Sequence, residues 1–261
     1  MKCEPARRQK RNQNKYTVTK EAMDILQLAE GLDSYRAKCA ASPINKAARR
    51  ADDYELDTIS PSATSFLKDA AANIPLIAST CEIAILDSSA DSGLPHTRPP
   101  NLICLPASMC KEQPASNDFK ITLLHEAIHV HQRLHPNIWK KGCTDAGWKE
   151  FPSEKIPETI RGRIRINPDT MATPYWSWDG QVPIPIFSQI ISPKLSGAKI
   201  EWYDIATGAI FHKPPASLLS KVTPAEAEGA AVEHPYELYA DRFSRMGVDS
   251  HDKIMKALEN L

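Results

Sequence analysis

The segment 122–132 has the sequence TLLHEAIHVHQ, inside a longer stretch, 118–134, in which apolar residues recur at helical spacing. Asn117 or Asp118 can cap the start of a helix there. Pro136 discourages its continuation. We therefore expect a well-formed helix whose apolar packing holds the histidines of the segment rigidly.

Two histidines in this helix have the spacing of a pair of metal ligands. Residues four apart lie on one helical face with Cβ atoms roughly 5–6 Å apart, so His125 and His129 can direct their imidazoles at one ion. Glu126 points to the side of that pair, where it can take a proton from a water on the metal. The H-E-x-x-H pattern predicts one zinc ion (Zn2+) and hydrolysis, with Glu126 as general base.

His135 is one candidate for the third ligand that catalytic zinc usually needs. Its distance from His125 and His129 matches the metzincin pattern H-E-x-x-H-x-x-G-x-x-H, but Gln132 replaces the glycine that lets the helix stop sharply. If the helix does not break, His135 lies ~80° off the face of His125. We therefore keep His135 as the alternative ligand.

Glu237 is the preferred third ligand. It lies in the segment EHPYELYADRF (233–243), where Pro235 suits the first turn of a helix. Glu237 and Asp241 are then on one face, so Glu237 can ligate while Asp241 accepts a hydrogen bond from a ligand histidine. Other acids left open for this role are Asp145, Glu150, Glu154, Glu158 and Asp169.

With these two segments the sequence resembles the gluzincin peptidases, in which H-E-x-x-H is followed by a helix carrying E-x-x-x-D or a close variant. The resemblance implies that His125, His129 and Glu237 bind zinc, that Glu126 is the general base and that Asp241 orients a ligand histidine. It covers about a tenth of the chain, and about a hundred residues separate His129 from Glu237. Residues 137–222 would then form a β-rich insertion.

The remaining pattern predicts an α+β fold with a zincin-like catalytic core, an upstream small mixed sheet and C-terminal helices within 233–261. The expected helices run from Thr19 towards Lys38, from Ser60–Pro61 to about Ala72, from Pro235 to Met246 and from Ser250 to Leu258. The expected strands are 81–87, 102–106, 162–166, 182–191 and 200–211, the last a hairpin with a Gly208 turn.

Composition and charge predict a single domain, 19–261, after a basic, solvated arm, 1–18. Lys plus Arg equal Asp plus Glu at 32 each, so nucleic acid is an unlikely partner except through the arm. We see no membrane span or signal peptide and expect an intracellular, cytoplasmic protein; unconventional export and the oligomeric state stay open. The six cysteines form no C-x-x-C pair, so we expect reduced thiols.

Three further expectations concern the substrate, which we take to be a protein or peptide. The oxyanion of the tetrahedral intermediate needs a donor, for which the candidates are Tyr236, Tyr239, His234 and Tyr175. The strand 102–106 could pair with an extended substrate. Trp176, Trp178 and Trp202 are expected to pack in the core or in a hairpin, with a substrate-binding wall as the alternative.

The leading interpretation is a zinc metallopeptidase, with an endopeptidase favoured over an exopeptidase. The alternatives are an inactive zinc-containing scaffold that binds a partner, and a zinc hydrolase of a non-peptide amide or of one dedicated protein. Glu126 favours activity, because a purely structural site gains nothing from a carboxylate beside its ligands.

Overall fold

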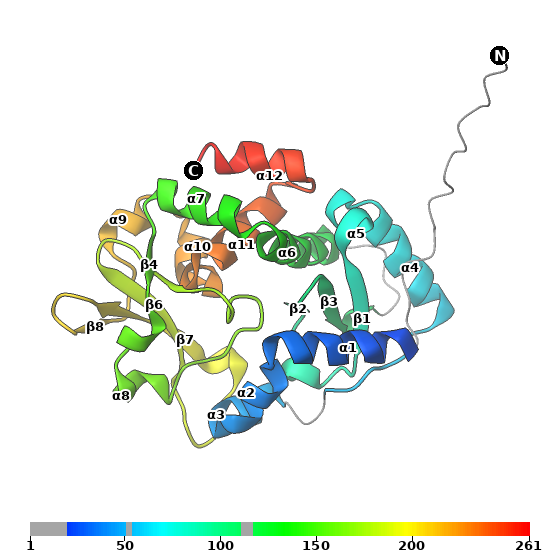
Figure 1. Ribbon diagram of the computed structural model, residues 1–261, viewed down its shortest axis with the longest axis horizontal. Helices are drawn as coiled ribbons and strands as arrows, with labels where there is room; N and C mark the ends of the chain where they lie inside the picture. Colours follow the sequence, from blue (N-terminus) through cyan, green and yellow to red (C-terminus); the bar gives the residue numbers. More distant parts are fainter. Residues whose placement is uncertain (1–19, 51–53, 111–116) are drawn as a thin grey trace, which may run out of the picture.

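The computed structural model describes residues 20–50, 54–110 and 117–261 and shows the predicted mixed α+β fold (Figure 1). The α-helices are α1 (Lys20–Asp33), α2 (Tyr35–Ala41), α3 (Pro43–Arg49), α4 (Pro61–Ala72), α5 (Pro75–Thr80), α6 (Asn117–Leu134), α7 (Pro136–Ala146), α8 (Glu158–Arg161), α9 (Ala216–Leu219), α10 (Pro224–Glu228), α11 (Pro235–Arg245) and α12 (His251–Leu258). The strands are β1 (Glu82–Leu86), β2 (His96–Arg98), β3 (Leu102–Pro106), β4 (Lys149–Phe151), β5 (Tyr175–Ser177), β6 (Gln181–Phe187), β7 (Ala198–Asp204) and β8 (Ile210–Phe211). Short 3₁₀ helices are η2 (Ala90–Gly93), η3 (Ala107–Cys110), η4 (Ser153–Lys155), η5 (Leu195–Gly197) and η6 (Ala230–Glu233).

The first expected helix is divided in two. α1 ends at Asp33 and α2 begins at Tyr35, because Ser34 between them takes a left-handed conformation with φ 53. Its expected cap, Thr19, and the basic arm lie outside the described residues. The second expected helix is confirmed as α4, with Ser60 accepting a hydrogen bond from the Ala63 amide.

The upstream sheet is mixed, with strand order β1-β3-β2. β1 and β3 are parallel, as two buried apolar runs suggest, and β2 pairs antiparallel to β3. β2 was not predicted, since three residues are too few to show a period. β3 is the middle strand, with a partner on both sides, so the prediction that 102–106 pairs with substrate is wrong.

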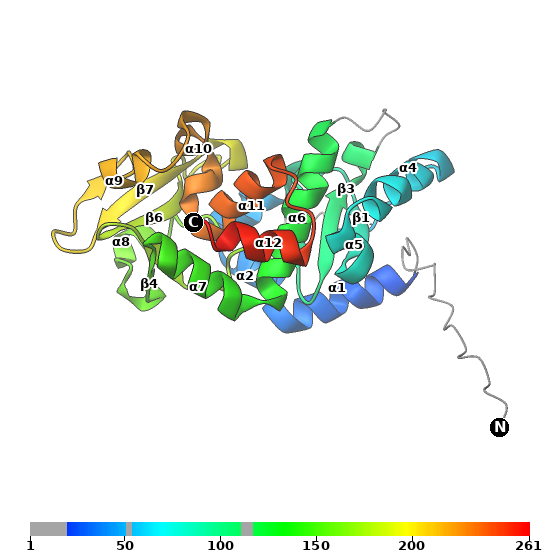
Figure 2. The ribbon, with the colours of Figure 1, turned by 90° about the horizontal axis from the view of Figure 1, so that it is seen from above.

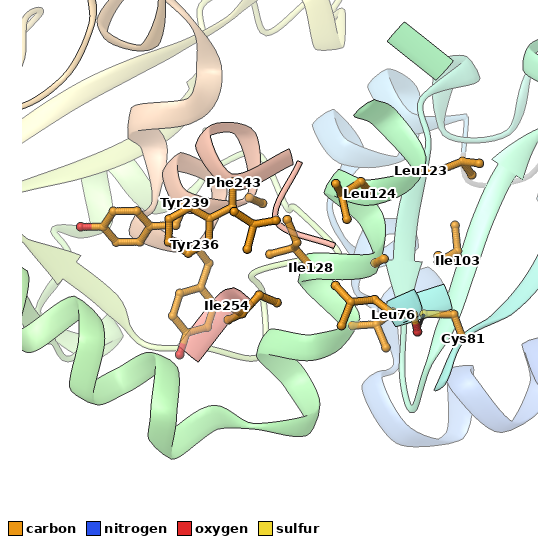
Figure 3. Close-up of a cluster of buried hydrophobic side chains, with 14 of the residues drawn as sticks. Leu76, Cys81, Ile103, Leu123, Leu124, Ile128, Tyr236, Tyr239, Phe243 and Ile254 are labelled. Atoms are coloured by element: carbon orange, nitrogen blue, oxygen red, sulfur yellow. Dashed lines mark hydrogen bonds between the residues drawn. The ribbon is translucent and has the colours of Figure 1, made fainter. Parts of the chain in front are cut away.

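α6 runs between this sheet and α11 and buries apolar side chains towards both (Figure 3). Leu123 and Leu124 belong to the same apolar cluster as Ile103 of β3, and Ile128 lies near the aromatic rings of α11. Leu123 and Ile128 are fully buried, and each such side chain contributes roughly 1.5–3 kcal/mol to folding. This packing fixes the rotation of α6 and hence the direction of its histidines.

The region after α6 begins with a helix that sequence reasoning missed. Pro136 does prevent continuation of α6, but it also occupies the first turn of α7, with His135 as the N-cap residue. The expected hairpin is confirmed as β7 and β8, with Gly208 at φ 73 in the turn. The expected strand 162–166 is reduced to an isolated bridge between Ile164 and Ile186.

The tryptophans show that this region shares the core of the whole chain. Trp176, Trp178 and Trp202 are buried in the same apolar cluster as α6 and α11, as predicted. Trp139 of α7 is also buried there and packs against the rings of Tyr236 and Phe243. The β-rich region is therefore packed onto α6 and α11 through these tryptophans, and it also has a smaller apolar cluster of its own around β6, which includes Ile160 and Ile184.

Both C-terminal helices are confirmed, as α11 and α12. α11 lies along α6, and α12 lies over both of them (Figure 2). Because the two long helices are neighbours, a residue on α11 can face the histidines of α6 although the two are far apart in sequence.

Five cysteines of the described residues are free and buried, in agreement with the expectation of reduced thiols: Cys39, Cys81, Cys104, Cys110 and Cys143. Cys3 lies outside the described residues. None of the helices in the described ranges has the length and apolarity that crossing a membrane requires.

Candidate metal centre

Three predicted ligands lie together at the contact of α6 and α11. The Nε2 atoms of His125 and His129 are 3.0 Å apart. The Oε2 atom of Glu237 lies 3.4 Å from the first and 3.3 Å from the second. Helix periodicity places the two histidines on one face, and Pro235 starts α11 so that Glu237 lies in its first turn. We call this set the His125/His129/Glu237 triad.

The triad has the dimensions of a zinc site. Metal–ligand distances of ~2.0–2.2 Å in a tetrahedron place neighbouring ligand atoms ~3.3–3.6 Å apart. The measured separations of 3.0, 3.4 and 3.3 Å are close to those values. Two imidazoles and one carboxylate leave one tetrahedral position for water or substrate, so the residues present fit a catalytic zinc ion.

Gln132 fixes the tautomer of His129. Its Nε2 donates to the backbone carbonyl of Tyr236 at 2.9 Å, which turns its Oε1 towards His129 Nδ1, 2.8 Å away. In its neutral form, His129 must therefore carry its proton on Nδ1, and the lone pair on Nε2 then faces the triad. Gln132, which replaces the glycine of the metzincin pattern, thus also links α6 to α11.

Asn167 orients Glu237, as Gln132 orients His129. Its Nδ2 donates to Glu237 Oε1 at 2.7 Å and to Glu233 Oε1 at 2.9 Å. With Oε1 held in this way, Oε2 of Glu237 is the atom that faces the histidines. Glu233 is itself paired with Arg165, so the carboxylates beside Asn167 are partly neutralised.

The electrostatics of the triad favour a cation between its members. Burial opposes a charge on His129, but the Glu237 carboxylate outweighs it and raises the pKa of His129 to about 10. Burial likewise opposes the charge on Glu237, yet His129 and His125 hold the pKa of Glu237 well below its ordinary value. The carboxylate of Glu237 thus stays ionised. The positive charge beside it comes from the proton on His129, which a bound metal ion could replace.

Glu126 lies beside the triad in a cleft of about 290 Å³ that His125, Glu237 and Asp169 also line. Its side chain is 3% exposed, and its Oε2 has no hydrogen-bond partner within the described residues. Burial, then the carboxylates of Asp169 and Glu237, raise the pKa of Glu126 well above its ordinary value. A buried carboxylate with an unpartnered oxygen in a cleft is typical of a group that handles a proton.

Asp241 does not take the position that we predicted. Its carboxylate pairs with Arg245, with Arg245 Nε 3.0 Å from Asp241 Oδ1, where we expected a hydrogen bond from a ligand histidine. The two residues are four apart on exposed turns of α11, so each is the nearest partner of the other. Both still line the cleft, together with Glu237.

The predicted oxyanion donors point elsewhere. Tyr236 packs on Trp139, and Tyr239 lines a separate hollow beside Trp148. His234 caps α11 by accepting from the Tyr236 amide. Tyr175 lines another cavity, with His234. None of the four is among the residues that line the cleft beside Glu126, and for Tyr236 and Tyr239 the reason is that the aromatic face of α11 is the face that the core buries.

His135 is not with His125 and His129. It forms a separate group with His131 and His251, whose ligand atoms lie within 4.8 Å of one another. His131 Nδ1 accepts from Trp139 Nε1 at 2.9 Å, which puts the proton of the neutral ring on Nε2. His131 therefore offers this second group no free lone pair, and the group does not resemble a metal site.

Comparison of the chain with family models, curated protein sequences and solved structures gave no significant match. The chemistry of the centre must therefore be argued from its own residues.

Gln132 and Asn167, which orient two of the three ligands, were missed from the sequence. Gln132 could have been found, since it follows His129 by three residues on the same helical face. Asn167 and Asp169 come from a loop, and His96 comes from the short β2, so no periodicity marks them. Asp169 accepts from the Thr97 amide at 2.6 Å, which fixes this loop over β2 beside Glu126.

Proposed function

We propose that this chain is a zinc-dependent metallopeptidase of the zincin-like, gluzincin type, hydrolysing peptide bonds in a protein or peptide. The observation that carries the proposal is the His125/His129/Glu237 triad with the unpartnered Oε2 of Glu126 beside it. The small mixed sheet beside α6, and the position of α11 along α6, support the proposal.

His125, His129 and Glu237 would hold the zinc ion, and Gln132 and Asn167 would keep two of them aligned. A zinc ion so held acts as a Lewis acid on the scissile carbonyl and lowers the pKa of a water to ~7. The ligands are buried or half-buried between packed helices, so they are positioned before substrate arrives.

Glu126 supplies the proton transfer. The water oxygen bonds to the carbonyl carbon while Glu126 Oε2 takes the water's proton; the same carboxyl then protonates the amide nitrogen as the C–N bond breaks. The elevated pKa of Glu126 brings its proton affinity nearer to that of the groups it serves. Of the three arginines that line the cleft, Arg49 and Arg165 are held in ion pairs with buried carboxylates, so the exposed Arg245 is the one that would approach an oxyanion.

The test is Glu126→Gln. The variant should bind one zinc ion per chain, as measured by elemental analysis, and lose peptide hydrolysis by about 10²–10⁴-fold. Glu158→Gln is the matched control, since Glu158 lies on the surface with its side chain 86% exposed. Hydrolysis retained by Glu126→Gln would remove the general-base role. Zinc bound by the wild-type chain without hydrolysis of any peptide would indicate a structural zinc.

A further inference from the structure

β7 has an edge with no strand partner. It is the middle strand of the β6-β7-β8 sheet, but β8 pairs only with Trp202 and Tyr203. Within the described ranges, no strand or bridge covers residues 198–201 on the side that β8 occupies farther along. An uncovered strand edge offers backbone donors and acceptors in a row.

The prolines of β6 show which backbone groups point outward. Pro185 faces Ile200 and has no N–H to give, and its carbonyl accepts from the Arg165 amide on the opposite side. Pro185 and Ile200 therefore form a pair without hydrogen bonds between them, and Ile200 must direct its own N–H and C=O away from β6. The Asp204 amide, four residues along β7, also points away from β6, to Ala209.

The uncovered edge lines a groove of about 1080 Å³, which we call the edge groove. Residues of the α9–α10 region, including Leu219 and Glu228, also line this groove. Figure 2 shows both helices beside β7. Val222, Thr223 and Gly229 line both this groove and an adjoining hollow that contains His125 and Glu237. The edge groove thus adjoins the hollow that contains two of the candidate metal ligands.

The edges of the sheet beside α6 are partly covered. β3 has a partner on both sides, the outward amide of Thr97 in β2 already donates to Asp169, and residues 55–57 bond to the outer edge of β1 at Ile85 and Leu86. A substrate that binds through its backbone near the triad would therefore find its partner on β7.

We propose that an extended polypeptide segment of the substrate adds to residues 198–201 of β7 as a new strand and runs through the edge groove to the triad. This inference rests on the proposed function and names its substrate class, an unfolded or locally extended protein segment. Two exposed lysines of the groove, Lys199 and Lys213, face one exposed acid, Glu228, so an acidic segment is preferred. Backbone pairing provides the affinity and side-chain contacts the selectivity.

The test uses zinc-loaded Glu126→Gln protein and a fluorescent acidic peptide of about eight residues, ~26 Å when extended. Ile200→Pro removes the outward N–H without touching a bond to β6 and should raise the peptide Kd about tenfold. Ile190→Pro is the matched control, because Ile190 is exposed and does not line the groove. Hydrogen exchange should show the Ile200 amide protected when the peptide binds.

Lys199→Glu gives a second measure in case the proline variant does not fold. It should weaken binding of the acidic peptide at low salt and strengthen binding of a basic one. Unchanged affinity in Ile200→Pro and Lys199→Glu, together with intact hydrolysis when the same substitutions are made in the wild-type chain, would overturn the docking inference alone. Peptide that protects Ile200 in the zinc-loaded wild-type chain but is never cleaved would overturn the hydrolytic function alone. A dimer that Ile200→Pro abolishes would assign the edge to a second copy and overturn the inference.

Discussion

His129 and Gln132 lie on one face of α6, and the 2.8 Å contact between Nδ1 and Oε1 decides which nitrogen of His129 faces the triad. The same amide reaches Tyr236 on α11. One glutamine therefore links the orientation of a metal ligand to the packing of the two helices that form the centre.

Replacing Gln132 should weaken zinc binding without removing a ligand. In Gln132→Ala, His129 loses the acceptor for Nδ1–H, and its ring can rotate or change tautomer. We expect the zinc Kd to rise about 10–100-fold. Competition with a chromophoric chelator measures this, and Gln132→Glu, which keeps an acceptor for Nδ1, should recover part of the loss. An unchanged Kd in Gln132→Ala would contradict the role of the glutamine.

Replacing Asn167 should affect zinc affinity more than replacing Asp241. The pattern E-x-x-x-D predicts a role for Asp241 instead, so the two variants test the structure against the sequence pattern. Asn167→Ala frees Oε1 of Glu237 and should raise the zinc Kd about 10–100-fold. Asp241→Asn breaks only the surface pair with Arg245, a contact worth ~0–1 kcal/mol, and should leave zinc affinity within about threefold. Isothermal titration of zinc into both variants decides it: a larger loss in Asp241→Asn would restore the role that E-x-x-x-D predicts.

The sequence predicted the parts of the centre that local periodicity determines. His125 and His129 were found from their spacing on a helix, and Glu237 from Pro235 and a second helical face. Asn167 could not be found in this way, and Asp169 was only one of several acids left open for the third ligand, because only tertiary packing brings their loop against α6 and β2. The sequence also does not show whether the carboxylate of Asp241, one turn after a ligand, will face a histidine or its neighbour Arg245.

The fold also has features that local sequence patterns predict and others that depend on tertiary contacts. Strands β1 and β3 were found from their apolar runs, but their parallel order and the antiparallel edge strand β2 depend on contacts beyond each segment. Pro136 was understood as a helix terminator, although it also begins α7. A proline marks the boundary of one helix, but it does not reveal whether a loop, a strand or another helix comes next.

Zinc binding should release a proton from His129. Because Glu237 raises the pKa of His129 to about 10, the zinc-free protein holds this proton at pH 7–8, and the metal must displace it. Apparent affinity should therefore rise up to about tenfold per pH unit below that pKa. Calorimetry in buffers of different ionisation enthalpy counts the proton. Glu237→Gln removes the charge that retains it, so fewer protons should be released at pH 8; equal release would contradict this electrostatic account.

Acid should destabilise the zinc-free protein through His131. Burial, with His135 and His251 adding to it, lowers the pKa of His131 to about 3, whereas the unfolded chain protonates it near its ordinary value of 6.5. The unfolded state then binds more protons between these values, so the free energy of unfolding falls as pH drops through that window. The expected loss between pH 6.5 and 4.5 is about 1–2 kcal/mol, since a difference of one in pKa corresponds to ~1.4 kcal/mol and nearby solvent reduces the full effect.

His131→Gln isolates this contribution, because glutamine does not titrate and its Oε1 can still accept from Trp139 Nε1. Urea unfolding of both proteins in excess chelator, at pH 7 and pH 4.5, gives the comparison. The wild-type chain should lose more stability than the variant over this interval, because only its unfolded state gains the extra proton. Equal losses would mean that His131 is protonated in the folded protein as readily as in the unfolded chain, and that its contact with Trp139 does not keep it neutral.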